Sequence, residues 1–142
     1  MSSRAPRRIV GNPAHDQRPN TDLVVLFLPA PVSVNAIWTR KAGGGVRLSD
    51  AYRAWLQEAG WSLEQQRPGA IRGRYELTLR LPEQSGLDLD NAVKATSDLL
   101  QSHGVIRDDR DASRIVLEWQ RERPEAVVRV APFAPSSSIT SE

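Results

Sequence analysis

Residues 74–81, with the sequence RYELTLRL, set the fold class of the chain. Apolar and polar residues alternate strictly along this stretch, a pattern typical of a β-strand that buries one face. Residues 89–100, with the sequence LDNAVKATSDLL, have apolar residues at helical spacing instead, and Gly104 follows as a natural terminator. A half-buried strand followed by an amphipathic helix predicts a sheet that is covered by helices.

The sequence on either side adds strands and one more helix. Residues 23–28 (LVVLFL) predict a strand that is covered on both faces, and residues 50–65 predict a helix that Ser49 caps. Further strands are expected at 37–41 and 46–48, which form a hairpin around a glycine-rich turn, and at 114–121 and 126–131. The order predicts an α+β fold, in which two helices pack on one mixed β-sheet, within a single domain at residues 22–131.

The composition and the ends of the chain limit the possible classes. The chain has 142 residues, of which 39% are hydrophobic, as expected for one globular domain. Residues 1–21 predict a disordered basic arm, and residues 132–142 predict a disordered tail. No apolar run is long enough for a membrane helix, and residues 1–20 do not form a signal peptide, so a cytoplasmic location without a membrane partner is expected.

The chain has no cysteine, and its two histidines are His15 and His103. These counts exclude a disulfide scaffold, a thiolate metal site, a cysteine nucleophile and a histidine-rich metal site. Any bound metal would be a hard cation that oxygen ligands hold. Residues 1–20 contain four arginines and one aspartate, whereas the rest is close to neutral, so basicity alone is weak evidence for nucleic-acid binding.

Two groups of acidic residues flank the second predicted helix. Asp88 and Asp90 straddle the start of this helix, and Lys94 lies one turn further along, on the same face as Asp90. The second group follows the end of the helix and consists of Asp108, Asp109 and Asp111. The first helical turn therefore presents carboxylates and an amine together.

The two groups meet if the chain runs straight back along the helix. The helix spans about 18 Å, and the extended residues 104–109 reach about 17–18 Å, so Asp109 can approach Asp88 and Asp90. Carboxylates in one small space need a cation between them, and Mg²⁺ or Mn²⁺ suits such oxygen ligands. Such an ion can activate a water molecule for attack on a phosphodiester, and Lys94 could hold this water or stabilise the developing charge.

The same residues also have a purely structural interpretation. Asp88 can be an N-cap, Asp90 and Lys94 can form an exposed ion pair, and the later aspartates can be turn residues. Spacing alone leaves both interpretations open. A calcium-binding EF-hand loop that starts at Asp88 is excluded, because Val93 and Leu99 occupy the positions that require glycine and glutamate.

The acidic motifs resemble those of the RusA-type Holliday-junction resolvases. The matching blocks are Asp88-Leu89-Asp90-Asn91, then Lys94, then Gly104-Val105-Ile106-Arg107-Asp108-Asp109. An early stretch of Pro31, Ser33, Asn35 and Trp38 also matches the family pattern Pro-x-Ser-x-Asn-x-x-Trp/Tyr. The resemblance covers about residues 23–131 and implies a RusA-like fold.

The resemblance implies a homodimeric, Mg²⁺-dependent endodeoxyribonuclease that acts on branched DNA in recombination and repair. Members of this family resolve four-way junctions by paired symmetric nicks and are often carried by phages or prophages. The resemblance therefore implies that the protein acts at the nucleoid of a bacterial or phage-infected cell. The matching metal and catalytic residues are Asp88, Asp90 and Asp109, with Lys94 as the matching lysine. The alternative is a non-catalytic nucleic-acid-binding protein that retains the fold.

The sequence departs from the family just before the first acidic block. Members often carry an arginine run there, whereas residues 82–87 contain one acid and no base. Because contacts between basic residues and phosphates supply most of the affinity for DNA, other residues must provide these contacts. The expected DNA contacts are Arg40, Lys41, Arg47, Arg107 and Arg110.

Overall fold

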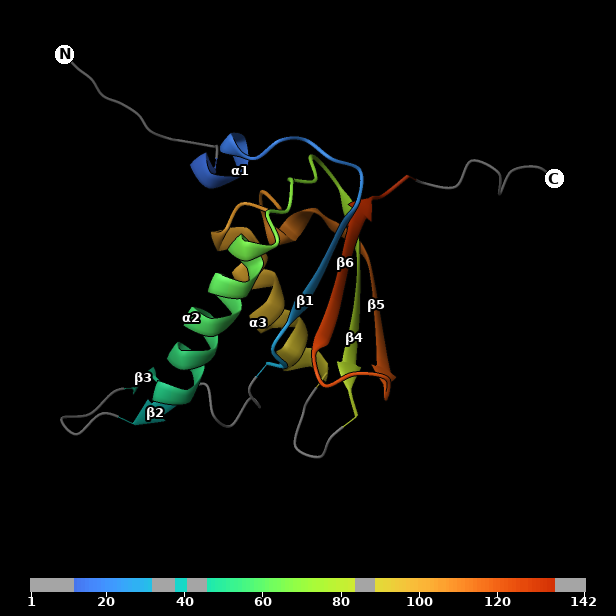
Figure 1. Ribbon diagram of the computed structural model, residues 1–142. Helices are drawn as coiled ribbons and strands as arrows, with labels where there is room; N and C mark the ends of the chain where they lie inside the picture. The colour runs from blue at the N-terminus through green and yellow to red at the C-terminus, as the bar shows by residue number, and fades with distance from the viewer. Residues whose placement is uncertain (1–11, 32–37, 41–45, 84–88, 135–142) are drawn as a thin grey trace, which may run out of the picture.

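The computed structural model describes residues 12–31, 38–40, 46–83 and 89–134 (Figure 1). Its helices are α1 (Pro13–Gln17), α2 (Asp50–Gln65), α3 (Leu89–Ser102) and the short 3₁₀ helix η2 (Asp109–Asp111). Its strands are β1 (Val24–Leu28), β2 (Trp38–Arg40), β3 (Val46–Leu48), β4 (Tyr75–Pro82), β5 (Ala112–Gln120) and β6 (Ala126–Pro132). The predicted α+β class is confirmed.

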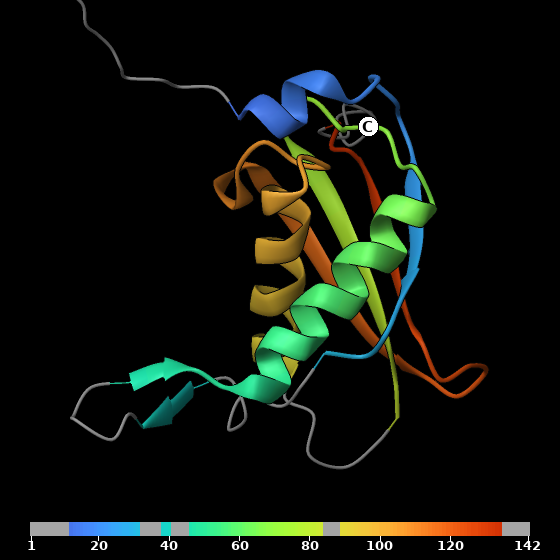
Figure 2. The ribbon, with the colours of Figure 1, turned by 60° about the vertical axis from the view of Figure 1, so that its left-hand side comes forward.

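Four strands form one mixed sheet in the order β1-β6-β4-β5. Strand β6 is antiparallel to both β1 and β4, whereas β4 and β5 are parallel. Parallel neighbours need a crossover connection, and α3 provides it. Strands β2 and β3 form a separate hairpin, so the prediction that all strands share one sheet is wrong for them. They pair with each other beyond the start of α2, away from the sheet (Figure 2).

Helices α2 and α3 cover one face of the sheet and bury the core against it (Figure 2). Alternate residues of β4 point into this core, as its sequence pattern predicts. Alternate residues of β1 do so too, but Val25 and Phe27 are 42% and 38% exposed, so the prediction that this strand is covered on both faces is wrong. Helix α2 adds Trp55, Ala59 and Leu63, and α3 adds Leu99 and Leu100. Ser49 caps α2 by accepting a hydrogen bond from the backbone N–H of Tyr52 at 3.1 Å, which confirms the predicted cap.

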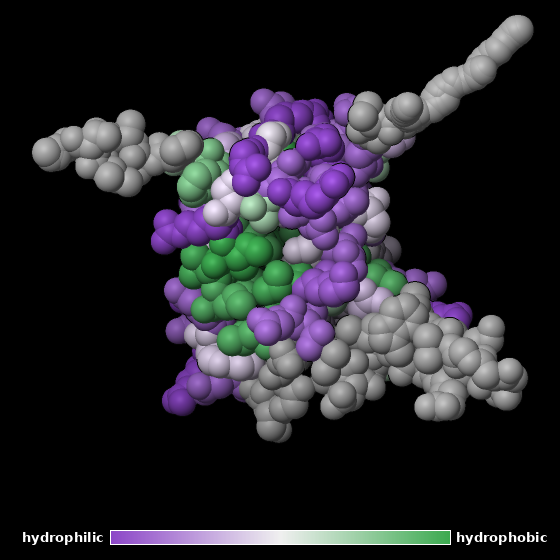
Figure 3. Space-filling model, turned by 180° about the vertical axis from the view of Figure 1, so that it is seen from behind, coloured by the Kyte–Doolittle hydropathy of each residue, from purple (hydrophilic) through white to green (hydrophobic). Residues whose placement is uncertain are grey.

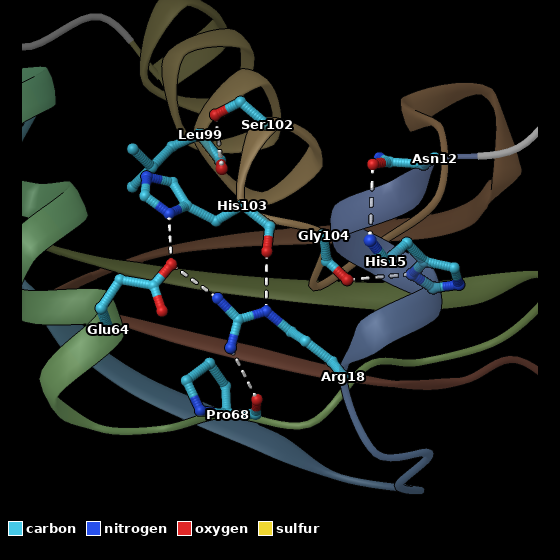
Figure 4. Close-up of polar contacts among 9 residues, drawn as sticks. All are labelled: Asn12, His15, Arg18, Glu64, Pro68, Leu99, Ser102, His103 and Gly104. Atoms are coloured by element: carbon cyan, nitrogen blue, oxygen red, sulfur yellow. Dashed lines mark hydrogen bonds and ion pairs between the residues drawn. The ribbon is translucent and has the colours of Figure 1, made fainter.

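Residues 12–21 contain α1 and make defined contacts, so the prediction of a disordered arm is wrong for this part, while residues 1–11 lie outside the described residues. Arg18 donates hydrogen bonds to the carbonyl of His103 at 2.7 Å, the carbonyl of Pro68 at 3.1 Å and the carboxylate of Glu64 at 2.7 Å (Figure 4). The buried His15 donates from Nδ1 to the carbonyl of Gly104 at 2.9 Å. These basic side chains bind backbone carbonyls near the C-terminal ends of α2 and α3 instead of remaining in solvent.

The first residues of the predicted tail belong to the described fold. Strand β6 continues to Pro132, and the backbone N–H of Phe133 donates to the carbonyl of Arg74 at 3.0 Å. Residues 135–142 lie outside the described residues. Across the described ranges, no helix has the length and apolar character that a membrane crossing requires.

Candidate functional site

The first acidic group is at the N-terminal end of α3. Asp90 lies in the first turn of this helix and is exposed, as is Lys94 one turn later. A carboxylate in the first turn interacts favourably with the helix dipole. Asp88 lies outside the described residues. The structure therefore brings Asp90 and Lys94 to one exposed face, as the sequence predicts.

The second acidic group surrounds η2. Asp108 caps η2 by accepting a hydrogen bond from the backbone N–H of Arg110 at 2.9 Å. Hydrogen bonds from the Arg110 guanidinium and backbone lower the pKa of Asp108 to about 2. Arg107 forms an ion pair with Asp111 at 2.9 Å. The backbone N–H of Asp109 donates to Oε1 of Gln101 at 3.0 Å, which fixes Asp109 beside the last turn of α3.

Asp90 and Asp109 lie near opposite ends of α3. Three helical turns separate Asp90 from Gln101, the partner of Asp109, and this distance is about 16 Å along the axis. No group of three or more His, Asp or Glu residues that could hold a metal occurs within the described ranges. The expectation that Asp109 returns to Asp90 within one chain is therefore wrong.

The position of Asp109 follows from the two residues after Gly104. Val105 and Ile106 are fully buried in the core. The backbone N–H of Val105 donates a hydrogen bond to the carbonyl of Leu100 at 2.9 Å. The carbonyl of Val105 accepts one from the backbone N–H of Ile71, also at 2.9 Å. These contacts turn the chain into the core at the C-terminal end of α3, so it does not run straight back along the helix.

Tyr75 is a residue near the acidic group that the sequence did not single out. Its side chain is 1% exposed, and its hydroxyl has no hydrogen-bond partner within the described structure. Burial raises the pKa of Tyr75, and the carboxylates of Asp109, Asp111 and Asp108 raise it further. The alternation of residues 74–81 predicts that this side chain is buried, but not that it lies under η2.

The predicted DNA contacts fall at two ends of the molecule. Arg40 and Arg47 are in the β2–β3 hairpin, while Lys41 lies outside the described residues. Arg107 precedes η2 and Arg110 lies within it, and their side chains remain 46% and 86% exposed despite their ion pairs. The hairpin and η2 lie at opposite ends of α3 (Figure 2), so one chain does not join these four arginines into one patch.

Comparison with known proteins identifies the family of this fold. A family model for the endodeoxyribonuclease RusA matches residues 29–131. The chain belongs to the RusA family. The matched range contains the hairpin, both long helices and both acidic groups. The fold and the recognised family are therefore confirmed, and the chain is a member of a family of Holliday-junction-resolving endodeoxyribonucleases.

A curated RusA protein is also similar to this chain. The crossover junction endodeoxyribonuclease RusA from Aquifex aeolicus (strain VF5) is 29% identical over 117 residues. The similar region covers 79% of this chain and 91% of the relative. The similarity therefore extends over nearly the whole of the RusA relative and is not confined to the acidic motifs.

Proposed function

We propose that the protein is a Mg²⁺-dependent, structure-selective endonuclease that resolves four-way DNA junctions by paired symmetric nicks. The RusA match over residues 29–131 carries this proposal, because it spans the whole acidic constellation. The relative's name describes cutting at crossover junctions, and the proposal extends this substrate to the present chain.

The proposed metal ligands are Asp88, Asp90 and Asp109, with Lys94 beside them. A set of carboxylates fits a hard divalent cation, so Mg²⁺ is the expected ion and Mn²⁺ a possible substitute. When bound, such an ion polarises the phosphodiester and lowers the pKa of a coordinated water molecule. The exposed ammonium of Lys94 would orient the phosphate or balance its negative charge.

A homodimer is part of the proposal, because one chain keeps Asp90 and Asp109 at opposite ends of α3. In a dimer with two-fold symmetry and antiparallel α3 helices, Asp109 of one copy comes to the end that carries Asp90 of the other. Two symmetric nicks in a junction also require two sites that symmetry relates. Each proposed active site would therefore contain carboxylates from both copies.

A nicking assay with a synthetic four-way junction tests the proposal. The wild type should nick the junction with Mg²⁺ but not with EDTA, and should leave a matched linear duplex uncut. Asp90→Asn should lower the nicking rate at least about 100-fold, since it removes a metal ligand, and should retain junction binding. Asp98→Asn is the matched control, because Asp98 is an exposed carboxylate two turns further along α3.

Mixing two inactive variants tests the sharing of the site between copies. A dimer of one Asp90→Asn chain and one Asp109→Asn chain keeps one intact site if the ligands come from different copies. The mixture should then recover single-strand nicking that neither variant shows alone. If the wild type binds the junction without nicking it under any metal condition, the non-catalytic alternative is correct instead.

A further inference from the structure

Residues 12–18, which contain α1, lie at the end of the molecule that carries η2. Figure 2 shows α1 beside the C-terminal end of α3 and close to η2, far from the β2–β3 hairpin. The RusA family model begins its match at residue 29, so this stretch lies outside the matched range. Its role therefore has to be worked out from its contacts.

The side chain of Asn12 binds both ends of the segment that leads from α3 to Asp109. Its Nδ2 donates to the carbonyl of Gln101, in the last turn of α3, at 2.9 Å and to the carbonyl of Arg107 at 3.3 Å. Its Oδ1 accepts a hydrogen bond from the backbone N–H of His15, so Asn12 also caps α1. One side chain therefore connects α1, the end of α3 and the residue two positions before Asp109.

Two further side chains bind the same segment. His15 donates to the carbonyl of Gly104 at 2.9 Å, and Arg18 donates to the carbonyl of His103 at 2.7 Å (Figure 4). Arg72 in turn donates to the backbone carbonyls of His15 and Arg18, at 2.6 and 2.7 Å, and so holds both donors in place. Carbonyls at the end of a helix have no partner within the helix, and these side chains supply one.

The 3₁₀ helix η2 has no buried residue, so apolar packing does not fix its position. Seen from behind, hydrophilic residues gather at this end of the molecule, above an apolar patch (Figure 3). Exposed segments with few buried contacts open at a low cost in free energy. The backbone N–H of Asp109 bonds Oε1 of Gln101, and the carbonyl of the same Gln101 accepts from Asn12. The position of Asp109 therefore depends on hydrogen bonds that continue through Gln101 to Asn12.

We propose that Asn12 is a positioning residue for Asp109, and that residues 12–18 form a brace that holds η2 ready to bind a metal ion. The role of Asn12 in the reaction rests on the proposed function, whereas the brace itself does not. Groups that orient a metal ligand without touching the metal change metal affinity or activity about 10–100-fold when they are removed. A carboxylate that the fold already holds in place loses less conformational freedom when it binds.

Two substitutions of Asn12 separate the brace from the cap of α1. Aspartate and serine are both good N-caps, so Asn12→Asp and Asn12→Ser keep an acceptor for His15 but remove the Nδ2 donor. In the metal-free chain, the NMR order parameters of the backbone of residues 108–111 should be about 0.85 in the wild type and below about 0.6 in both variants. Because only Asn12→Asp adds a charge, loss of order in that variant alone would overturn the brace.

Asn20→Asp is the matched control. Asn20 is exposed in the same part of the chain, where its backbone pairs with Ala70. The same change of charge at this position should leave the order of η2 unchanged. Strand β4 should keep its order in every variant and shows in the same spectra that the fold is intact.

Gln101→Met tests the same connection from the side of α3, since it removes Oε1 and leaves residues 12–18 unaltered. It should loosen η2 as the Asn12 variants do. If Gln101→Met loosens η2 but neither Asn12 variant does, α3 alone holds Asp109 and the brace is overturned. Unchanged order in all three variants would overturn it as well.

The metal dependence of nicking is a second and separate readout. Both Asn12 variants should raise the Mg²⁺ concentration for half-maximal nicking by about 10-fold or more. The nicking rate at saturating Mg²⁺ and the affinity for the junction in EDTA should stay close to those of the wild type. A loosened η2 with an unchanged Mg²⁺ requirement would overturn the positioning role of Asn12. A wild type that does not nick contradicts the proposed function, whereas the order parameters still decide the brace.

Discussion

Gly104 occupies a position that only glycine can fill. Its φ of 80° lies in the left-handed region, and a Cβ there would overlap the backbone of Ala14 and His15. Gly104→Ala should therefore lower the free energy of unfolding by about 2–4 kcal/mol, because backbone strain and a collision with α1 add together. Urea unfolding monitored by tryptophan fluorescence measures this loss.

Gly73 provides the matched control for that substitution. It has a similar φ of 75°, but a Cβ there would meet no atom within 4 Å. Gly73→Ala should cost only the left-handed strain, about 1 kcal/mol. Equal losses for the two variants would show that the contact with α1 does not constrain Gly104.

Tyr75 should tolerate loss of its hydroxyl. Among the residues that the structure describes, this oxygen is buried without a hydrogen-bond partner, so the folded state carries the cost of its desolvation. Tyr75→Phe should leave the stability unchanged or raise it by about 1 kcal/mol. Thermal unfolding at pH 7 measures the change, and a loss of more than about 1 kcal/mol would show that the hydroxyl has a stabilising partner.

At the scale of the elements, the contact between α1 and the ends of the long helices should depend on pH through Glu64. Partial burial raises the pKa of Glu64, but hydrogen bonds from Arg18 and His103 outweigh this effect and lower it (Figure 4). A carboxyl with a lowered pKa stabilises the fold above its unfolded pKa of about 4.3, and this contribution is lost as the pH falls through the folded value.

Glu64→Gln should therefore be less stable than the wild type at pH 7, by about 0.5–1 kcal/mol, a value discounted because the side chain is 49% exposed. The difference should close as the pH falls below about 4. Melting temperatures measured from pH 3 to pH 7 give both values. Glu58→Gln, at an exposed position of α2, should show no such trend. A constant difference at every pH would contradict the role of the charge.

The sequence predicts those elements that local patterns determine. The alternation of residues 74–81 predicts β4, and the apolar spacing of residues 89–100 predicts α3, because each pattern reports one buried face. The order of α1 depends instead on contacts across the chain, such as those of Arg18 with Pro68 and His103. No local pattern distinguishes an arginine that binds such carbonyls from one in solvent.

The candidate site is predicted in its residues but not in its arrangement. Asp90 and Lys94 share a face because helical geometry alone fixes their spacing. The placement of Asp109 depends on whether residues 105 and 106 are buried, and the two apolar side chains directly after Gly104 are the signal that was available. The extended length of a segment limits how far it can span, whereas the burial of its side chains determines the direction in which it runs.

At the scale of the whole molecule, DNA binding should depend on the hairpin. If Arg40 and Arg47 contact phosphates, the double variant Arg40→Gln/Arg47→Gln should weaken junction binding. The slope of the logarithm of the binding constant against the logarithm of the salt concentration should also become less steep by about 1–2. Each lost phosphate contact removes about 0.9 from the magnitude of this slope. Titrations at several salt concentrations measure both effects.

Arg129→Gln is the control for this measurement. Arg129 is exposed on β6, on the face of the sheet that the helices leave uncovered. Its loss should leave the salt dependence unchanged. A salt dependence that is the same in the double variant and the wild type would exclude the hairpin as a phosphate-binding element.

The amide of Gln66 has a consequence for how this protein behaves when it is crowded by other chains. At the β1 border of the sheet, Gln66 is bonded to both the N–H and the carbonyl of Phe27. Addition of a foreign strand opposite Phe27 would require both hydrogen bonds to break. The glutamine therefore protects this part of the border against edge-to-edge aggregation.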